Sequence, residues 1–305
     1  VSASLDMPMA SDARFRIVLK SAGKQPLNKM KAQRLRVYLA DPTVQSAMLY
    51  LWIRRYGRWV EVRNPTTGKS SKLPIEAIKP VGFGRDEGLL PFPAHSFVGY
   101  RLLQEYFTCP AKFYFLDFNV LDRLPLVDAT DQVEIIVPFS RKPEDTMRVD
   151  KDSLRLFCTP IVNLFKHDAD GLRVDHTRTQ YRIRPASVGS PQEHYEIYTV
   201  EKVVGLVQGE ADRRVYPPLH SFKHVGIPGQ EAIYYQTRLY DAVVGEGTDT
   251  YISFVSADEN FVVPPTETIS MELTCSNRNL ASRLKVGDVS VPTSRSPEFA
   301  RFRNI

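Results

Sequence analysis

Residues 195–206 read YEIYTVEKVVGL, and this stretch decides how the second part of the chain folds. Its β-branched and aromatic residues predict a long β-strand. Further candidate strands lie around it, at 133–138, 154–159, 181–184, 232–241, 250–255 and 267–274. Turn-forming residues separate these runs, among them Asp170-Gly171 and Pro228-Gly229. Many short strands with few helices predict a mainly antiparallel β-sandwich or barrel-like domain over residues 126–305.

The preceding residues, 1–125, combine strands with helices. Alternating apolar and polar residues, or apolar runs, predict strands at 14–20, 34–39, 59–63 and 113–118. A first helix is expected to start with Asp41 as its cap and Pro42 in its first turn. It should end near Gly57, where glycine permits a left-handed residue. The whole chain is therefore expected to be α+β and β-rich, with a small mixed domain first.

A second helix is expected after a long glycine- and proline-rich connection over residues 80–96. Ser96 is expected to cap this helix and Pro110 to stop it. Its aromatic stripe consists of Phe97, Tyr100, Leu103 and Phe107. Such stripes more often face a core, although interfaces also favour Tyr, Phe and Arg. Residues 83–107 are thus a candidate docking surface. The contacts expected there are Phe83, Arg85, Phe92, Tyr100, Arg101 and Glu105.

The composition is that of a soluble globular protein, with 43% hydrophobic and 25% charged residues among 305. This balance excludes a mainly disordered chain, and no apolar run is long enough to span a bilayer. Cys109, Cys158 and Cys275 are too few and too scattered for a disulfide framework, so we expect reduced thiols. Residues 1–10 lack the pattern of a signal peptide, and the missing initiator Met fits a segment of a longer protein.

The net charge of +5 is unevenly distributed. Residues 1–80 contain fifteen Lys and Arg but five Asp and Glu, a balance of +10, whereas residues 81–305 carry −5. A basic first part indicates an anionic partner, an acidic protein surface or simply a solvated surface. A nucleic-acid-binding module that uses these 80 residues is one alternative function. It is disfavoured because the basic residues lack interleaved aromatic side chains for base stacking.

Two motifs resemble ligand-binding loops without meeting their requirements. Gly82, Gly84 and Gly88 have the wrong spacing for a nucleotide loop, and no capped helix follows them directly. Asp168 and Asp170 resemble the start of a calcium loop, but the twelfth position is Thr179 rather than a glutamate. We therefore interpret the glycines as easing a tight loop and the Asp170-Gly171 pair as a hairpin turn.

A thiol hydrolase centred on Cys158 and His176 is the other alternative function. His167 and Asp175 also lie near in sequence, but none of the six histidines has the close spacing of a metal-binding pair. Apolar residues flank Cys158, which should raise its pKa and keep the thiol inert. No catalytic constellation, metal site or cofactor site is therefore expected, and we interpret the chain as a non-enzyme.

Several runs resemble the TssF family of type VI secretion baseplate subunits, also called ImpG or VasA. They occur in the family's order between about residues 34 and 287, and the resemblance does not place residues 1–33. The runs are VGFGRDEGLLPFP (81–93), SFVGYRLLQEYF (96–107), KFYFLDF (112–118), CTPIVNLF (158–165), DHTRTQYR (175–182), YEIYTV (195–200) and TCSNRNL (274–280). The last run departs from the family pattern, with Asn279 in place of an acid and Ala281 in place of a proline.

The resemblance implies a central fragment of a cytoplasmic scaffold, a wedge component of a contractile injection machine similar to a phage tail. Its implied partners are TssG, a second TssF copy, TssK, TssE, and spike and sheath components, with the baseplate docked at the inner face of the cytoplasmic membrane complex. No membrane insertion or small-molecule substrate is implied. The matched residues that we interpret as fold determinants are Cys158, Pro160, Asn163, Arg182, Cys275, Asn277 and Arg278.

Overall fold

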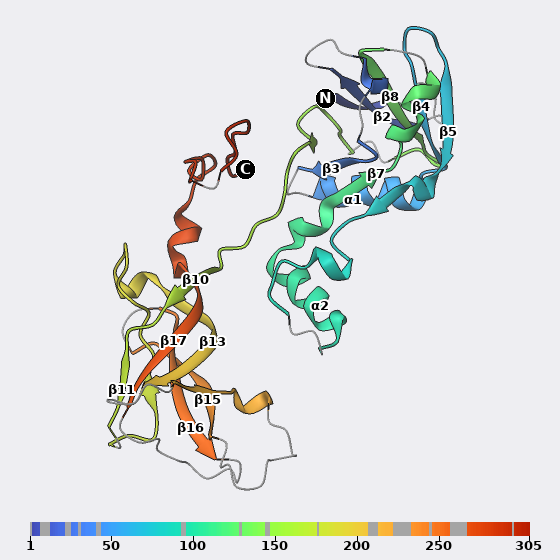
Figure 1. Cartoon of the computed structure of the whole chain (residues 1–305). Helices are drawn as coiled ribbons and strands as arrows, with labels where there is room; N and C mark the ends of the chain where they lie inside the picture. The colour runs from blue at the N-terminus through green and yellow to red at the C-terminus, as the bar shows by residue number, and fades with distance from the viewer. Residues whose placement is uncertain are drawn as a thin grey trace. The chain divides into compact units, whose positions relative to one another are not determined.

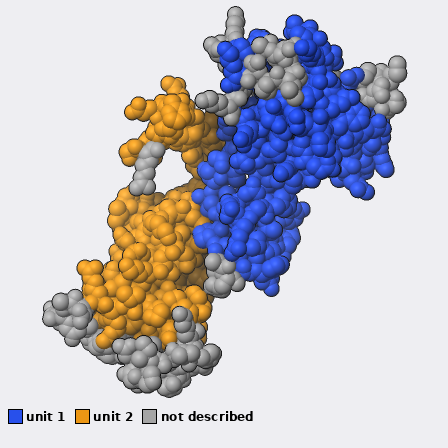
Figure 2. All heavy atoms as spheres, turned by 45° about the vertical axis from the view of Figure 1, so that its right-hand side comes forward, with its two compact units in different colours: residues 1–162 blue, residues 163–305 orange. Residues whose placement is uncertain are grey.

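The chain folds into two compact units, residues 1–162 and 163–305, which are coloured separately in Figure 2. The computed structural model describes residues 2–6, 13–21, 26–29, 32–40, 44–92, 96–127, 130–143, 147–175, 177–206, 213–221, 233–243, 246–256, 267–294 and 296–305. Strands outnumber helices in both units, and all strand pairs in the described sheets are antiparallel (Figure 1). The expected β-rich α+β class is confirmed.

The first unit contains two sheets that share one hydrophobic core. The five-stranded sheet has the order β1 (Ser2–Asp6), β2 (Arg14–Lys20), β8 (Gln132–Pro138), β4 (Trp59–Arg63), β5 (Ser70–Pro74). The other has the order β6 (Ile78–Pro80), β7 (Phe115–Phe118), β3 (Leu35–Leu39), β9 (Leu154–Arg155). In β2 the alternation is as expected, because Phe15 and Ile17 are fully buried while Arg14 and Arg16 are partly exposed.

The division between the units falls later than the boundary expected at residue 125. Strand β8 lies between β2 and β4, pairing with both, and β9 pairs with β3. Both strands therefore belong to the first unit, although they follow residue 125. Four residues of β8, Val133 and Ile135 to Val137, are buried, as suits a central strand that packs on both faces.

The first helix, α1 (Val44–Leu51), continues directly into a π-helical turn, η2 (Trp52–Tyr56). The expected cap residues Asp41 and Pro42 lie outside the described residues. Gly57 ends the helical segment as expected, but its φ of −61° and ψ of 133° are extended rather than left-handed. Glycine is required here because a side chain would clash with its neighbours. A Cβ atom at residue 57 would lie 2.4 Å from the Ile53 carbonyl oxygen and 2.6 Å from Ile75 Cδ1.

The second helix, α2 (Val98–Thr108), begins one residue later than expected. Phe97, not Ser96, occupies the cap position, and it makes no side-chain capping bond. The helix stops before Pro110, as expected, and that proline opens the 3₁₀ helix η5 (Pro110–Tyr114). The strand expected at 113–118 is correspondingly shorter, because β7 starts at Phe115.

The second unit is a β-sandwich whose two sheets share a core. One sheet contains β10 (Phe165–Asp168), β11 (Leu172–Val174), β17 (Glu267–Ser276), β13 (Glu196–Leu206) and β14 (Arg213–Tyr216). The other contains β12 (Tyr181–Arg182), β16 (Thr248–Ser256) and β15 (Ile233–Asp241). Among the described strands neither sheet closes into a barrel, so of the two expected architectures the sandwich is the one observed.

The prediction of a hairpin turn at Asp170-Gly171 is wrong. Strands β10 and β11 both pair antiparallel with β17, so the chain keeps its direction through residues 169–171. At this interruption Ala169 bridges to Pro185, and the Asp170 N–H donates to the Arg184 carbonyl at 2.8 Å. The two residues therefore form a break within an edge strand, not a reversal.

Short 3₁₀ helices complete the described structure. They are η1 (Leu27–Lys29), η3 (Ile75–Ala77), η4 (Arg85–Glu87), η6 (Leu121–Val127), η7 (Gln192–His194), η8 (Leu219–Ser221) and η9 (Arg278–Arg283). Within the ranges given above, no helix is both long and apolar enough to cross a membrane.

We predict that Gly57→Ala destabilises the first unit by about 1–3 kcal/mol, the usual cost of overpacking, because the new methyl group overlaps the Ile53 carbonyl. Chemical unfolding measures the change. Gly171→Ala is the control, since its Cβ would lie 3.5 Å from Thr268 Cγ2, an ordinary contact, and should change stability by less than about 0.5 kcal/mol. Equal stability of the native chain and Gly57→Ala would contradict the steric explanation.

Candidate partner interface

Helix α2 places its charged residues inside and its aromatic residues outside. Arg101 is 4% exposed and Glu105 is 1% exposed, whereas Tyr100 is 71% and Phe107 75% exposed. This is the reverse of an ordinary amphipathic helix, in which the apolar side faces the core. The unit must therefore supply partners for two buried charges, and it leaves an aromatic surface uncovered.

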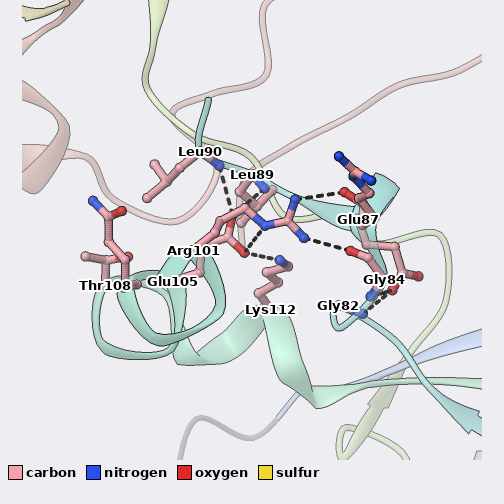
Figure 3. A network of polar contacts seen from close by, with 11 residues as sticks. Gly82, Gly84, Glu87, Leu89, Leu90, Arg101, Glu105, Thr108 and Lys112 are labelled. Atoms are coloured by element: carbon pink, nitrogen blue, oxygen red, sulfur yellow. Dashed lines mark hydrogen bonds and ion pairs between the residues drawn. The ribbon is translucent and has the colours of Figure 1, made fainter. Parts of the chain in front are cut away.

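Glu105 ties the loop before α2 to the helix after it (Figure 3). Its Oε1 accepts hydrogen bonds from the N–H groups of Leu89 at 2.7 Å and Leu90 at 3.0 Å. Its Oε2 forms a buried ion pair with Lys112 of η5, and Arg101 Nε lies 3.9 Å from the same oxygen. One carboxylate thus holds three separate segments together.

Arg101 fixes the other end of the same loop. Its Nη1 donates to the Arg85 carbonyl and its Nη2 to the Gly84 carbonyl, both at 2.8 Å. The loop lies so close to this guanidinium that a Cβ at Gly88 would lie 2.6 Å from Arg101 Nη1. A side chain at residue 88 would have to displace this guanidinium from its hydrogen bonds to the loop, which gives a reason for one of the three glycines of the motif.

The remaining glycines bind a carboxylate of the chain itself. Glu87 Oε2 accepts from the N–H groups of Gly82 at 2.8 Å and Gly84 at 2.9 Å. Gly82 has a φ of 100°, a conformation that favours glycine. Glu87 therefore occupies two amide donors of this loop that could otherwise face a phosphate.

A second ion-pair group anchors the loop to the sheet. Arg36 of β3 donates from Nε to Asp117 Oδ1 at 2.7 Å and from Nη2 to Asp117 Oδ2 at 2.8 Å, and Nη2 lies 3.8 Å from Glu87 Oε1. The hydrogen bonds to Asp117 raise the pKa of Arg36 above its ordinary value. Arg34 also pairs with Asp117, and Arg16 pairs with Glu134. Part of the basic excess before residue 80 is therefore compensated by acids that follow it.

The environment of Glu105 keeps this carboxyl group ionised. Burial alone would raise its pKa, but the hydrogen bond from Lys112 and the amides of Leu90 and Leu89 favour the carboxylate more strongly. The pKa of Glu105 therefore lies below its ordinary value of 4.5. At neutral pH the ion pair is fully formed.

The exposed surface of α2 and of the loop before it carries aromatic and aliphatic side chains, which we call the aromatic face. Its members are Phe83, Phe97, Tyr100, Leu103, Tyr106 and Phe107, all exposed. Phe83 packs on Phe113, with ring centroids 4.9 Å apart, and Phe113 also contacts Tyr106. Large exposed apolar patches of this kind mark interaction sites.

The structure divides the six expected interface residues into two groups. Phe83 and Tyr100 are exposed, and Phe92 is partly exposed, with its ring 5.9 Å from Arg101 Cζ. The backbone of Arg85 helps to hold Arg101. Arg101 and Glu105 are buried, so the expectation that they contact a partner is corrected. Their role is to hold the loop.

Lys112 and Tyr106 were missed as members of this region. Tyr106 falls at helical spacing from Leu103, a signal that could have added it to the aromatic face. Nothing local marks Lys112, because only the folded chain brings it to Glu105.

The cysteine considered for a thiol hydrolase does not have the lowered pKa of an activated thiol. Burial raises the pKa of Cys158 above its ordinary value, and that of Cys275 to about 11. His167 stacks on Tyr195 and its Nε2 contacts the Ala186 carbonyl at 2.8 Å, while His176 lies outside the described residues. The residues that can be assessed contain no group of three or more His, Cys, Asp or Glu placed to hold a metal ion.

Four of the expected fold determinants occupy positions that organise the sandwich. Cys275 is fully buried in the core, and Arg182 pairs with the buried Asp249 at 2.6 Å. Arg278 has a φ of 46° and directs its guanidinium to backbone carbonyls. Asn277 directly precedes it as the cap position of η9.

The other three expected determinants lie in the connection between β9 and β10. Cys158 and Pro160 are half-buried and Asn163 is exposed, and the division between the units falls after Val162. No side-chain hydrogen bond of Asn163 to the described part of the chain accounts for a structural role.

We predict that Glu105→Gln lowers the free energy of unfolding by about 3–5 kcal/mol, because it leaves Lys112 buried without its counter-ion. Glu76→Gln, the same change at an exposed site, should alter stability by less than about 0.5 kcal/mol. Denaturant unfolding distinguishes the two, and similar small effects for both variants would show that the buried pair contributes little.

The lowered pKa of Glu105 also predicts the pH dependence of this effect. The carboxylate stabilises the fold fully above its ordinary pKa of 4.5, and this stabilisation is lost as the pH falls through the lower pKa of the folded state. The stability difference between the native chain and Glu105→Gln should therefore shrink between about pH 5 and about pH 2. A difference that stays constant over that range would contradict the assignment.

Comparison with known proteins gives one consistent result. A sequence model described as "Type VI secretion system, TssF" matches residues 2–305. The chain is 26% identical over 293 residues to "Type VI secretion system component TssF1" of Pseudomonas aeruginosa, covering 90% of this chain and 46% of that protein. It also resembles a chain in the cryo-electron microscopy structure of the TssK-TssF-TssG baseplate subcomplex, with a TM-score of 0.70 and 26% identity, covering 91% of this chain and 50% of that one. The chain thus spans about half the length of these relatives. It belongs to the TssF family of the type VI secretion system.

Proposed function

We propose that this chain is a structural component of a type VI secretion baseplate wedge, which works by binding TssG and TssK and not by catalysis. The observation that carries the proposal is its similarity, over 91% of its length, to a chain of a TssK-TssF-TssG subcomplex. The inert environment of Cys158 agrees with a structural role.

The aromatic face of α2 is the surface that we assign to TssG. Its members carry no charge, and the charged residues of the helix, Arg101 and Glu105, are buried on the other side. An aromatic patch of this kind resembles the core of a permanent subunit interface more than a transient, charged contact. The buried network beneath it keeps the helix in place before the partner binds, which lowers the ordering cost of association.

The finer parts of the proposal follow from the family resemblance. They are a second TssF copy in the same wedge, contacts with TssE, spike and sheath components, and a cytoplasmic baseplate docked at the inner face of the membrane complex. No described feature favours nucleic acid, because several arginines of the basic segment already pair with Asp117 and Glu134.

We predict that Tyr100→Ser combined with Phe107→Ser weakens association with co-expressed TssG and TssK at least about tenfold, because aromatic residues dominate interface energies. The melting temperature should hardly change, since both side chains are exposed. Quantitative co-purification and thermal unfolding measure the two effects.

The matched control is Tyr198→Ser combined with Phe299→Ser, which removes one exposed tyrosine and one exposed phenylalanine of the second unit. This control should bind like the native chain. Equal weakening by both double variants would show that the aromatic face is not the contact. Failure of the native chain to associate with TssG and TssK would overturn the proposed function itself.

A further inference from the structure

Three motifs that are distant in sequence meet at one pocket of the second unit. The pocket has a volume of about 240 Å³ and lies where β12, η7 and the first residues of β13 and β16 come together with Arg278. Its lining includes residues from the runs 175–182, 195–200 and 274–280. Nothing in the proposed contact with TssG through α2 uses this pocket.

The walls of the pocket are fixed by charged groups bonded to each other and to the backbone. Arg182 Nη2 pairs with Asp249 Oδ1 at 2.6 Å. Glu196 Oε1 accepts from both the N–H and the hydroxyl of Thr248, each at 2.9 Å. Arg278 reaches the Thr248 carbonyl at 3.4 Å from its Nη2. The first residues of β16 are therefore held from three sides.

Three groups in this pocket have bonding capacity that the described residues do not use. The Arg184 side chain forms no hydrogen bond or ion pair with any described residue. Arg278 Nε is buried without a partner, and its guanidinium otherwise meets only carbonyls, which leave its charge unneutralised. Asp249, 4% exposed, has Oδ2 buried without a partner. Unsatisfied buried polar groups are rare and call for an explanation.

The unused groups define the chemistry of a ligand. Two guanidinium groups without a carboxylate partner in the described structure, the exposed Arg184 and the half-buried Arg278, attract an anion, and planar carboxylates suit them through paired, charge-assisted hydrogen bonds. The free oxygen of Asp249 requires a donor on the same ligand. An acidic residue within a peptide supplies both, a side-chain carboxylate and backbone N–H groups. A bare anion would instead face the carboxylates of Asp249 and of Glu193, which also lines the pocket, without offering a donor to either. The volume of the pocket equals that of about eight water molecules, which leaves room for one such side chain with its peptide group.

We infer that this pocket binds an acidic segment of a partner protein, with an Asp or Glu side chain between Arg184 and Arg278 and a backbone N–H directed at Asp249. This inference depends on the proposed function in one respect only, namely that the chain has a partner protein. Peptide binding is measured on the isolated chain, so its failure would leave association with TssG and TssK untouched.

The experiment titrates the 305-residue chain with the end-blocked peptide Gly-Glu-Glu-Gly and, separately, with Gly-Gln-Gln-Gly and inorganic phosphate. Isothermal calorimetry or backbone NMR shifts of residues around the pocket report binding. The glutamate peptide should bind and the glutamine peptide should bind at least about tenfold more weakly, which is the effect of losing one charge-assisted hydrogen bond. Phosphate binding as tight as that of the glutamate peptide would overturn the peptide assignment.

Arg184→Gln tests the pocket itself, since this exposed side chain supports no described contact and the variant should fold normally. Its affinity for the glutamate peptide should fall about tenfold. Arg173→Gln is the matched control, the same change at an exposed arginine of β11 outside the pocket, and should leave affinity unchanged. An equal loss of affinity in both variants would show that the peptide binds by general charge attraction and not in the pocket. If the native chain does not bind the glutamate peptide at all, the inference is wrong.

Discussion

The architecture of the first unit around its aromatic face depends on one buried carboxylate. Glu105 accepts two amides of the preceding loop and pairs with Lys112 of the following turn, so loop, helix and turn have a single common anchor. Burying a charge is costly unless it is paired and fully hydrogen-bonded. Because this network is nearly complete, α2 can turn its charges inward. The side chains left outside are then aromatic, which is an unusual surface for a helix and the reason it resembles an interface.

Local sequence patterns predicted where the strands and helices lie better than they predicted which side of each is buried. Alternation located β2 and β4, and the proline at residue 110 located the end of α2. The same patterns placed Arg101 and Glu105 at a partner surface, since charged helical residues are usually exposed. Their burial depends on Lys112 and on the amides of the loop, which only the folded chain brings together. No spacing rule along one helix contains that information.

Long-range pairing limited the remaining predictions in the same way. The apolar run of β8 reads like the strands that follow it, yet it inserts between β2 and β4, so the boundary between the units falls at residue 162 and not at 125. Arg182 was singled out without a partner because Asp249 follows 67 residues later. Gly57 was assigned a left-handed turn, whereas a close contact with Ile53 is what excludes a side chain there. In each example the deciding neighbour is distant in sequence.

The two surfaces differ in the kind of selectivity that they can provide. An aromatic face gains free energy by excluding water and accepts any partner of complementary shape, so it contributes affinity more than discrimination. The pocket of the second unit works in the opposite way, because the buried Arg278 Nε and Asp249 Oδ2, which have no partner among the described residues, penalise any segment that cannot satisfy them. The proposed function, in which the chain joins different subunits, calls for both properties. Because they lie on different compact units, we expect a substitution on the aromatic face to weaken assembly while recognition of an acidic segment is preserved.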